Sequence, residues 1–193
     1  RRVLFRSRGG AIVSSSPRGR GLQICQGIEQ SRSEVCLILH ADIRVEKEII
    51  KDIRICMAGE NSLGGCLGNR YESMRGGQWI IHSLNLIRAK FLGMSFGDQG
   101  QFFLRKSMQE GNWDLNLPIM EDVELSLCLL NHPSNKFFLF GGLVSSVRRW
   151  EKSNRLKNAL QIIFLVLSYC LRRKLSGKVD TQALYEKYYG KKK

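Results

Sequence analysis

The sequence predicts an α/β fold, in which strands alternate with helices around a sheet. Two observations indicate this fold. Short apolar runs are followed along most of the chain by segments with the apolar spacing of amphipathic helices. One run, at residues 34–39, continues from Val35 to Leu39 without a polar residue, as expected of a strand that is covered on both faces. The 193 residues are enough for one ordinary domain with a core of its own.

Strands are expected where short apolar runs lie near turn residues, at residues 11–15, 34–39, 64–70, 101–105, 137–140 and 144–147. Helices are expected where apolar residues recur three or four positions apart, at residues 20–30, 46–56, 79–91, 120–130 and 155–173. Because the two kinds of element alternate, the sheet is expected to contain parallel members.

The segment 155–173 is the longest helix that the sequence predicts. Its apolar centre, Leu160 to Leu171, has 12 residues, whereas a helix that crosses a bilayer needs roughly 20. Two interpretations remain open. The helix is buried in the fold, or it lies in a membrane surface with Arg172, Arg173 and Lys174 reaching the headgroups.

Positive charge is concentrated at the two ends of the chain, whose net charge is +14. Residues 1–28 carry six arginines and no acid, and residues 148–193 carry 13 basic residues against three acids. The middle of the chain is nearly neutral, with 12 basic and 14 acidic residues. A basic end beside an apolar helix is typical of a protein that binds an acidic surface, such as anionic lipid or nucleic acid, and the alternative is that the last lysines are simply solvated at a frayed terminus. No basic and aromatic stripe runs through the middle, so no specific nucleic-acid partner is predicted.

Six scattered cysteines, with no Cys-x-x-Cys pair, argue against a zinc knuckle or a disulfide framework. They indicate a reduced, cytoplasmic protein, peripheral on the inner face of a membrane if the basic helix binds lipid. Residues 1–7, RRVLFRS, contain too short an apolar run for a signal peptide. They look like a non-native tail, although an Arg-rich, acid-free start also fits a transit peptide.

His40 and Asp42 stand where the predicted strand 34–39 ends. In open α/β sheets the carboxyl edge of the strands forms the ligand crevice. A carboxylate there can hold Mg²⁺ or Mn²⁺ against a diphosphate, because hard cations prefer oxygen ligands. The alternative is that Asp42 only caps the helix that follows.

A second acidic group, formed by Glu121, Asp122 and Glu124, stands at the start of a predicted helix. Acids are ordinary at this position because the helix dipole favours them. Apolar residues, including Pro118, directly precede the group and allow a second interpretation, in which one of the acids is catalytic. A carboxylate beside apolar groups and a like charge has a raised pKa and can act as a general base.

Two shorter motifs complete the set. GDQG, residues 97–100, places Asp98 and Gln99 between glycines that allow close backbone approach, and is otherwise a turn. RRWEK, residues 148–152, offers arginines and a tryptophan that suit a phosphate and a sugar ring, or an exposed loop.

Taken in order, GRG-x-Q, LHAD, GDQG, MEDVEL and RRW resemble the inverting glycosyltransferases of family 2, which have the GT-A fold. The closest likeness is to a bacterial subgroup of transferases associated with radical-SAM and selenium-related proteins. It runs from about Gly19 to Trp150. The resemblance implies a GT-A-like (Rossmann-like) mixed sheet flanked by helices, a nucleotide-sugar donor and an acceptor hydroxyl.

The resemblance also implies roles for individual residues. Asp42, with His40 in place of the usual first acid, would hold the divalent metal, Mn²⁺ or Mg²⁺. Asp122 would be the general base, and Glu121 would orient groups near it. The remaining matches would bind the donor or the acceptor, and they are Gly19, Arg20, Gln23, Asp98, Gln99, Arg149 and Trp150.

One departure from the family pattern concerns the start of the chain. Nothing in residues 1–18 matches the strand–helix–strand unit that carries the family's nucleotide-binding aspartates. We therefore expect a tail (1–7), a partial GT-A domain (8–150) and a helical extension with a basic tail (151–193). The expected function is a metal-dependent, inverting glycosyltransferase whose nucleotide pocket is incomplete in this chain. The alternatives are a basic peripheral membrane module and a nucleic-acid-binding protein.

Overall fold

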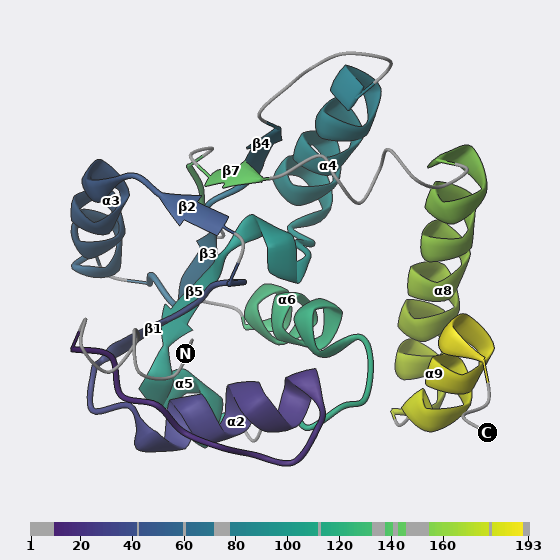
Figure 1. The fold of residues 1–193 in the computed structure, drawn as a ribbon, viewed down its shortest axis with the longest axis horizontal. Coiled ribbons are helices and arrows are strands. Elements are labelled where there is room, and N and C mark those ends of the chain that lie inside the picture. The colour runs from purple at the N-terminus through teal and green to yellow at the C-terminus, as the bar shows by residue number, and fades with distance from the viewer. Residues whose placement is uncertain are drawn as a thin grey trace.

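A computed structural model describes residues 10–41, 43–59, 61–71, 78–111, 113–132, 138–140, 143–145, 155–177 and 179–190. Within these residues the chain is a mixed α/β fold, with a four-stranded sheet flanked by helices (Figure 1). The expectation of a mixed sheet with flanking helices is thereby confirmed.

The main sheet has the strand order β1-β5-β3-β6. Its strands are β1 (Val35–Ile38), β5 (Gln101–Leu104), β3 (Gly64–Cys66) and β6 (Phe138–Leu139). β5 runs antiparallel to both of its neighbours, whereas β3 and β6 are parallel. β1 and β3 therefore point the same way without pairing, and β1 stands at an edge of the sheet.

A second sheet has three short strands in the order β2-β7-β4. They are β2 (Ile43–Val45), β7 (Leu143–Ser145) and β4 (Asn69–Tyr71). β7 is antiparallel to β2 and parallel to β4. The single strand expected at residues 64–70 is thus two strands, which belong to different sheets.

The two faces of the main sheet are covered by different elements, because neighbouring residues of β5 point to opposite sides. Phe102 packs with Ile49 and Ile53 of α3 (Lys47–Met57) and with residues of the small sheet. Phe103 packs instead with helices α2 (Arg20–Gln30) and α6 (Glu121–Asn131). The short helix α5 (Arg105–Glu110) follows β5 directly and contributes Met108 to the second cluster.

Two C-terminal helices, α8 (Arg155–Ser176) and α9 (Thr181–Tyr189), pack against α6 in a third apolar cluster. Its fully buried members include Val123, Leu165 and Tyr169. α9 begins where the Asp180 side chain accepts a hydrogen bond from the backbone N–H of Ala183, at 3.0 Å. The remaining long helix is α4 (Gln78–Leu92), which lies beside β4.

The helices predicted from apolar spacing agree with the observed ones within a few residues. The strand expected at residues 11–15 is wrong. This segment has no strand pairing and Ile12 is 88% exposed, so the apolar run gains nothing from a partner strand. β2, α5 and α9 were not expected. Residues 146 and 147 of the last predicted strand lie outside the described residues.

Candidate functional site

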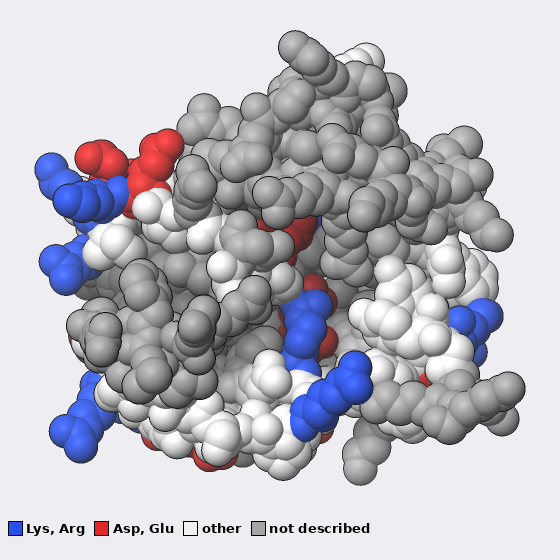
Figure 2. Space-filling model, viewed as in Figure 1, with Lys and Arg blue, Asp and Glu red and all other residues white. Residues whose placement is uncertain are grey.

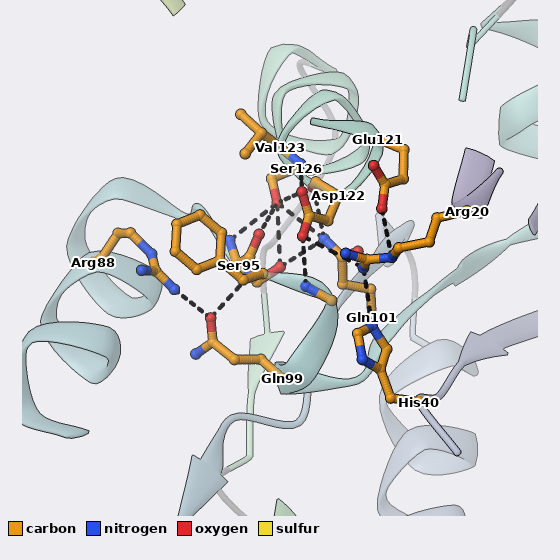
Figure 3. Close-up of polar contacts among 12 residues, drawn as sticks. Arg20, His40, Arg88, Ser95, Gln99, Gln101, Glu121, Asp122, Val123 and Ser126 are labelled. Atoms are coloured by element: carbon orange, nitrogen blue, oxygen red, sulfur yellow. Dashed lines mark hydrogen bonds and ion pairs between the residues drawn. The ribbon is translucent and has the colours of Figure 1, made fainter. Parts of the chain in front are cut away.

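Four elements bring charged side chains together beyond the end of β1. They are the first turn of α2, the residues that follow β1, a short 3-10 helix η1 (Gly97–Gln99) and the first turn of α6. Figure 3 shows Arg20 of α2 reaching between His40 and the carboxylates of Glu121 and Asp122. Figure 2 shows basic and acidic atoms meeting in a hollow near the centre of the face in view.

Arg20 is the centre of this cluster. Its Nε lies 2.9 Å from Oε1 of Glu121, and its Nη2 lies 3.8 Å from Oδ2 of Asp122. Nη2 also lies 2.9 Å from Nε2 of His40, so the guanidinium donates and the imidazole nitrogen accepts. Because the Arg20 side chain is 48% exposed, one side of its charge remains open to an incoming anion.

Glu121 is a buried acid, with only 2% of its side chain exposed. The pKa of Glu121 is raised from its ordinary 4.5 to about 7; burial is the largest cause, the charge of Asp122 adds to the rise, and Arg20 opposes it. The Oε1 atom makes no geometrically acceptable hydrogen bond, although the ion pair with Arg20 is short. Glu121 therefore serves to hold Arg20 rather than to meet a ligand.

Asp122 stands in front of Glu121 and is oriented by two backbone amides. Gly97 donates to Oδ2 and Val123 donates to Oδ1, each at 2.8 Å. The side chain is 15% exposed, so the carboxylate is fixed in place but remains accessible at the edge of the cluster. Of the two acids, Asp122 has the geometry of a group that can receive a proton from a bound molecule.

Gly97 allows η1 to approach this closely. A Cβ at this position would collide with Nη2 of Arg20 and would lie 2.7 Å from Nε2 of His40. Real Cβ atoms do not come so near other heavy atoms, so any larger residue would displace the two side chains. The absence of a side chain at residue 97 is therefore a requirement of the cluster.

A network of buried polar side chains lies behind the cluster, between β5 and α6. Gln101, at the start of β5, donates to the backbone oxygen of Asp122 at 2.8 Å and to Ser95 at 2.9 Å. Ser126, one turn after Asp122, accepts from the Ser95 amide at 3.0 Å and donates to the Asp122 oxygen at 3.0 Å. These contacts join β5 to the start of α6 and fix the position of the Asp122 backbone.

Gln99 points to the other side of η1. Its Oε1 accepts from Nη2 of Arg88 at 2.6 Å and from the Phe96 amide at 2.9 Å, and the Arg88 guanidinium lies 3.5 Å above the Phe96 ring. The amide nitrogen of Gln99 is buried and has no hydrogen-bond partner in the described chain. A buried donor of this kind normally has a partner, and because Gln99 is fully buried a ligand at the surface does not reach its Nε2.

Asp98 lies between these two groups. Burial raises the pKa of its carboxyl, and the charge of Asp122 adds to the rise, while Arg88 and His40 lower it. Asp98, Glu121 and Asp122 thus place three acids near two basic side chains, Arg20 and Arg88.

The backbone is strained next to the acidic pair. Met120 immediately precedes Glu121 and has φ 71° and ψ 15°. Residues other than glycine and asparagine rarely adopt this left-handed backbone conformation. Such a conformation costs of order 1 kcal/mol and persists where packing holds it, often at functional sites. Met120 is 7% exposed and packs in the cluster of α6, α8 and α9, which supplies that packing.

A groove of about 730 Å³ runs from this cluster along β1 and α2. Arg20, Gln23 and His40 stand at one part of its lining, and the side chains of β1 supply much of the rest. Its volume is within the range of small-molecule sites in proteins. The charged cluster therefore opens onto a space that is large enough for a ligand.

The described residues do not by themselves form a metal site. No group of three or more His, Cys, Asp or Glu residues in the described ranges is arranged to hold a metal ion. The Nε2 atom of His40 accepts from Arg20, and the same guanidinium faces both carboxylates. A divalent cation would compete with that positive charge. Asp42, the principal predicted ligand, lies outside the described residues.

The structure brings together many of the residues that the sequence singles out, namely Arg20, His40, Asp98, Gln99, Glu121 and Asp122. Gly19 precedes α2 and its carbonyl accepts from the Gln23 amide at 3.0 Å. Arg149 and Trp150 lie outside the described residues.

Glu124, grouped with the acidic pair in the sequence, points away from the cluster. It accepts hydrogen bonds from Tyr169 at 2.5 Å and from Nη2 of Arg173 at 2.9 Å, both on α8. Sequence reasoning missed Arg88, Ser95, Gln101 and Ser126. Only Gln101 carried a local signal, as a polar residue opening an apolar strand beside GDQG.

Comparison of the chain with models of protein families, with curated proteins and with solved structures gave no match.

Proposed function

We propose that the protein is a glycosyltransferase that moves a sugar from a nucleotide diphosphate to an acceptor hydroxyl with inversion. The single observation that supports this most is the position of Asp122. It is an accessible carboxylate, fixed by two backbone amides, next to an arginine that is half exposed at the end of a groove. A base and a positive charge side by side suit a reaction that removes a proton and releases an anion.

In the proposed reaction Asp122 accepts the proton of the acceptor hydroxyl as its oxygen attacks the anomeric carbon. The new bond forms on the face opposite the bond to the diphosphate, which breaks and takes its electron pair to the leaving phosphate oxygen. Arg20, whose outer side is exposed, offers positive charge to that phosphate. Glu121 holds Arg20 in place, and Gly97 keeps the carboxylate of Asp122 directed outward.

The proposal extends to the specific type of α/β fold. We propose that the mixed sheet with its flanking helices is a GT-A-like domain of glycosyltransferase family 2, because the order of motifs in the sequence favours that family. Asp98 lies next to the cluster, where it can contact the donor sugar or the acceptor, whereas Gln99 is fully buried on the other side of η1.

If the reaction uses a divalent ion, Asp42 is the residue that we propose as its ligand. Such an ion would offset negative charge on the departing diphosphate. The described side chains of the cluster already face the positive charge of Arg20, so His40 becomes a ligand only if Arg20 moves away from its Nε2 atom.

The test is a donor panel with the protein expressed from the complete reading frame of its gene. UDP- and GDP-sugars are supplied with Mn²⁺ or Mg²⁺, and release of nucleoside diphosphate is followed together with the anomeric configuration of the product. We expect release with one donor class and an inverted product. A retained configuration would exclude the single displacement by Asp122, and no release from any donor would count against the glycosyltransferase itself.

A further inference from the structure

One face of α8 exposes a long stripe of apolar side chains. Its members are Leu160, Ile163, Phe164, Leu167, Leu171 and Leu175, and they are between 49% and 76% exposed. Their spacing of three and four residues places them on one side of the helix. Leu165, Val166 and Tyr169 lie on the opposite side and are buried in the cluster with α6 and α9. The helix is therefore apolar on two opposite sides, and only one of them packs against the fold.

Figure 1 shows α8 at the right-hand edge of the molecule, where one side faces α6 and the other faces away from the fold. Exposed apolar residues are common when they are single, but a continuous stripe over four turns marks an interaction surface. A helix that is apolar all round is normally enclosed by protein or lipid.

The charges around the stripe are positive. α8 contains no acidic residue over its whole length. Arg172 and Lys174 are exposed near its C-terminal end, and Nζ of Lys187 on α9 lies 4.8 Å from the centre of the Phe164 ring. Long basic side chains beside an apolar stripe can reach outward to negatively charged headgroups while the stripe enters the lipid.

α8 has 22 residues, but its apolar content is not that of a membrane-spanning helix. In the part of the chain that the structure describes, no helix has the length and apolar content to cross a bilayer. A helix with an apolar face and basic flanks lies instead in the plane of the interface.

We propose that the exposed face of α8 docks the folded protein on the surface of an anionic lipid membrane. The stripe from Leu160 to Leu175 enters the region between headgroups and acyl chains, and Arg172, Lys174 and Lys187 contact the headgroups. The buried face of α8 stays on α6, because Arg173 and Tyr169 hold Glu124 there. This inference stands apart from the glycosyltransferase, since it concerns a surface that contains none of the residues of the charged cluster.

The experiment is co-sedimentation of the 193-residue chain with vesicles. One set contains phosphatidylcholine with phosphatidylserine, and the other contains phosphatidylcholine alone. We expect binding to the anionic vesicles that is about tenfold stronger than to the neutral ones and that weakens as salt is added. Leu167→Glu should lower the binding to anionic vesicles at least about tenfold, because it places a charge in the stripe.

Ile55→Glu is the matched control, because Ile55 on α3 is 64% exposed and Leu167 is 63% exposed. Thermal unfolding should show that both variants remain folded, since neither side chain is buried. Equal vesicle binding by the two variants, or no binding of the wild-type chain to anionic vesicles, would overturn the proposal. A dimer in sedimentation equilibrium that Leu167→Glu dissociates, without vesicle binding, would assign the face to a second copy of the chain instead.

Discussion

The Nε atom of Arg20 lies 2.9 Å from Oε1 of Glu121, and this ion pair joins the first turn of α2 to the first turn of α6. The carboxylate is 2% exposed, whereas the arginine is half exposed. The charge of Glu121 is thus held in a buried position by a partner that is still in contact with solvent. This relationship gives the stability of the protein a pH dependence that can be measured.

Glu121→Gln should become more stable relative to the wild type as the pH rises from 5 to 8. The pKa of Glu121 is raised in the folded state, from 4.5 to about 7, chiefly by burial. Its contribution to stability is therefore complete below pH 4.5 and is lost as the pH rises through about 7. The glutamine variant lacks this loss, so the difference in unfolding free energy should change by about 1–3 kcal/mol.

Urea unfolding of both proteins at several pH values measures the difference. Ionisable groups that do not interact with Glu121 contribute equally to the two proteins and cancel in the comparison, whereas Asp122, which interacts with it, is part of the measured difference. A difference that does not vary with pH would mean that Glu121 is ionised in both states over this range.

Gly97→Ala should disturb the charged cluster, because the new methyl group meets Nη2 of Arg20 and Nε2 of His40. Both atoms are at the far ends of side chains that can move aside, so we expect the free energy of unfolding to change by less than about 1 kcal/mol. The proton signals of the His40 ring should shift as its contact with Arg20 is lost.

Gly27→Ala is the control for that substitution. Gly27 lies in α2, and a Cβ there meets nothing within 4 Å. Alanine in an exposed helix position should stabilise the protein by about 1 kcal/mol. If both substitutions stabilise the protein and leave the His40 signals unchanged, η1 is not packed against the cluster as described.

Arg173→Met should lower the free energy of unfolding by about 3 kcal/mol, because it leaves the buried carboxylate of Glu124 without its positive partner. Glu124 is 5% exposed, and Arg173 contacts both of its oxygens. Arg172→Met removes an exposed arginine from the adjacent position and should change stability by less than about 0.5 kcal/mol. Denaturant unfolding of the two variants compares them, and similar losses would show that α8 is not anchored on α6 through Glu124.

The local parts of this fold could be predicted from the sequence, and the long-range parts could not. The helix at residues 20–30 was predicted with its observed bounds, because apolar spacing is a local property. Strand β2 was missed, because it has only three residues and its partner β7 is about a hundred residues away in the sequence. Residues 11–15 looked like a strand, but an apolar run needs a neighbouring strand, and none pairs with it in the described chain.

The site was predictable to a similar extent. Glu121 and Asp122 were found because two acids beside an apolar approach are unusual. That Glu121 is the buried member and Asp122 the accessible one depends on Arg20 and Gly97, which are distant in the sequence. Glu124 was grouped with them by proximity, but it lies two positions after Asp122, about 200° around the helix, and it faces α8.

Asp42→Ala should weaken Mn²⁺-dependent binding of the sugar nucleotide if Asp42 carries the metal, and calorimetric titration of the donor with and without Mn²⁺ measures this. Asp52→Ala, at an exposed position in α3, is a control that should leave binding unchanged. An unaltered Mn²⁺ affinity in the Asp42 variant would exclude Asp42 as a metal ligand; the helix-cap alternative is wrong, because β2 follows residue 42 and Glu46 is the N-cap of α3.

The central claim, that Asp122 is the general base of sugar transfer, is tested most directly by Asp122→Asn in the protein expressed from the complete reading frame. Asparagine keeps the shape of the side chain and, through its single oxygen, one of the two contacts with the Gly97 and Val123 amides, but it cannot accept a proton from a hydroxyl. We predict that turnover falls by about 10²–10⁴-fold while the affinity for the donor stays within a few-fold of the wild type. Turnover equal to that of the wild type would remove Asp122 from the mechanism and contradict the account.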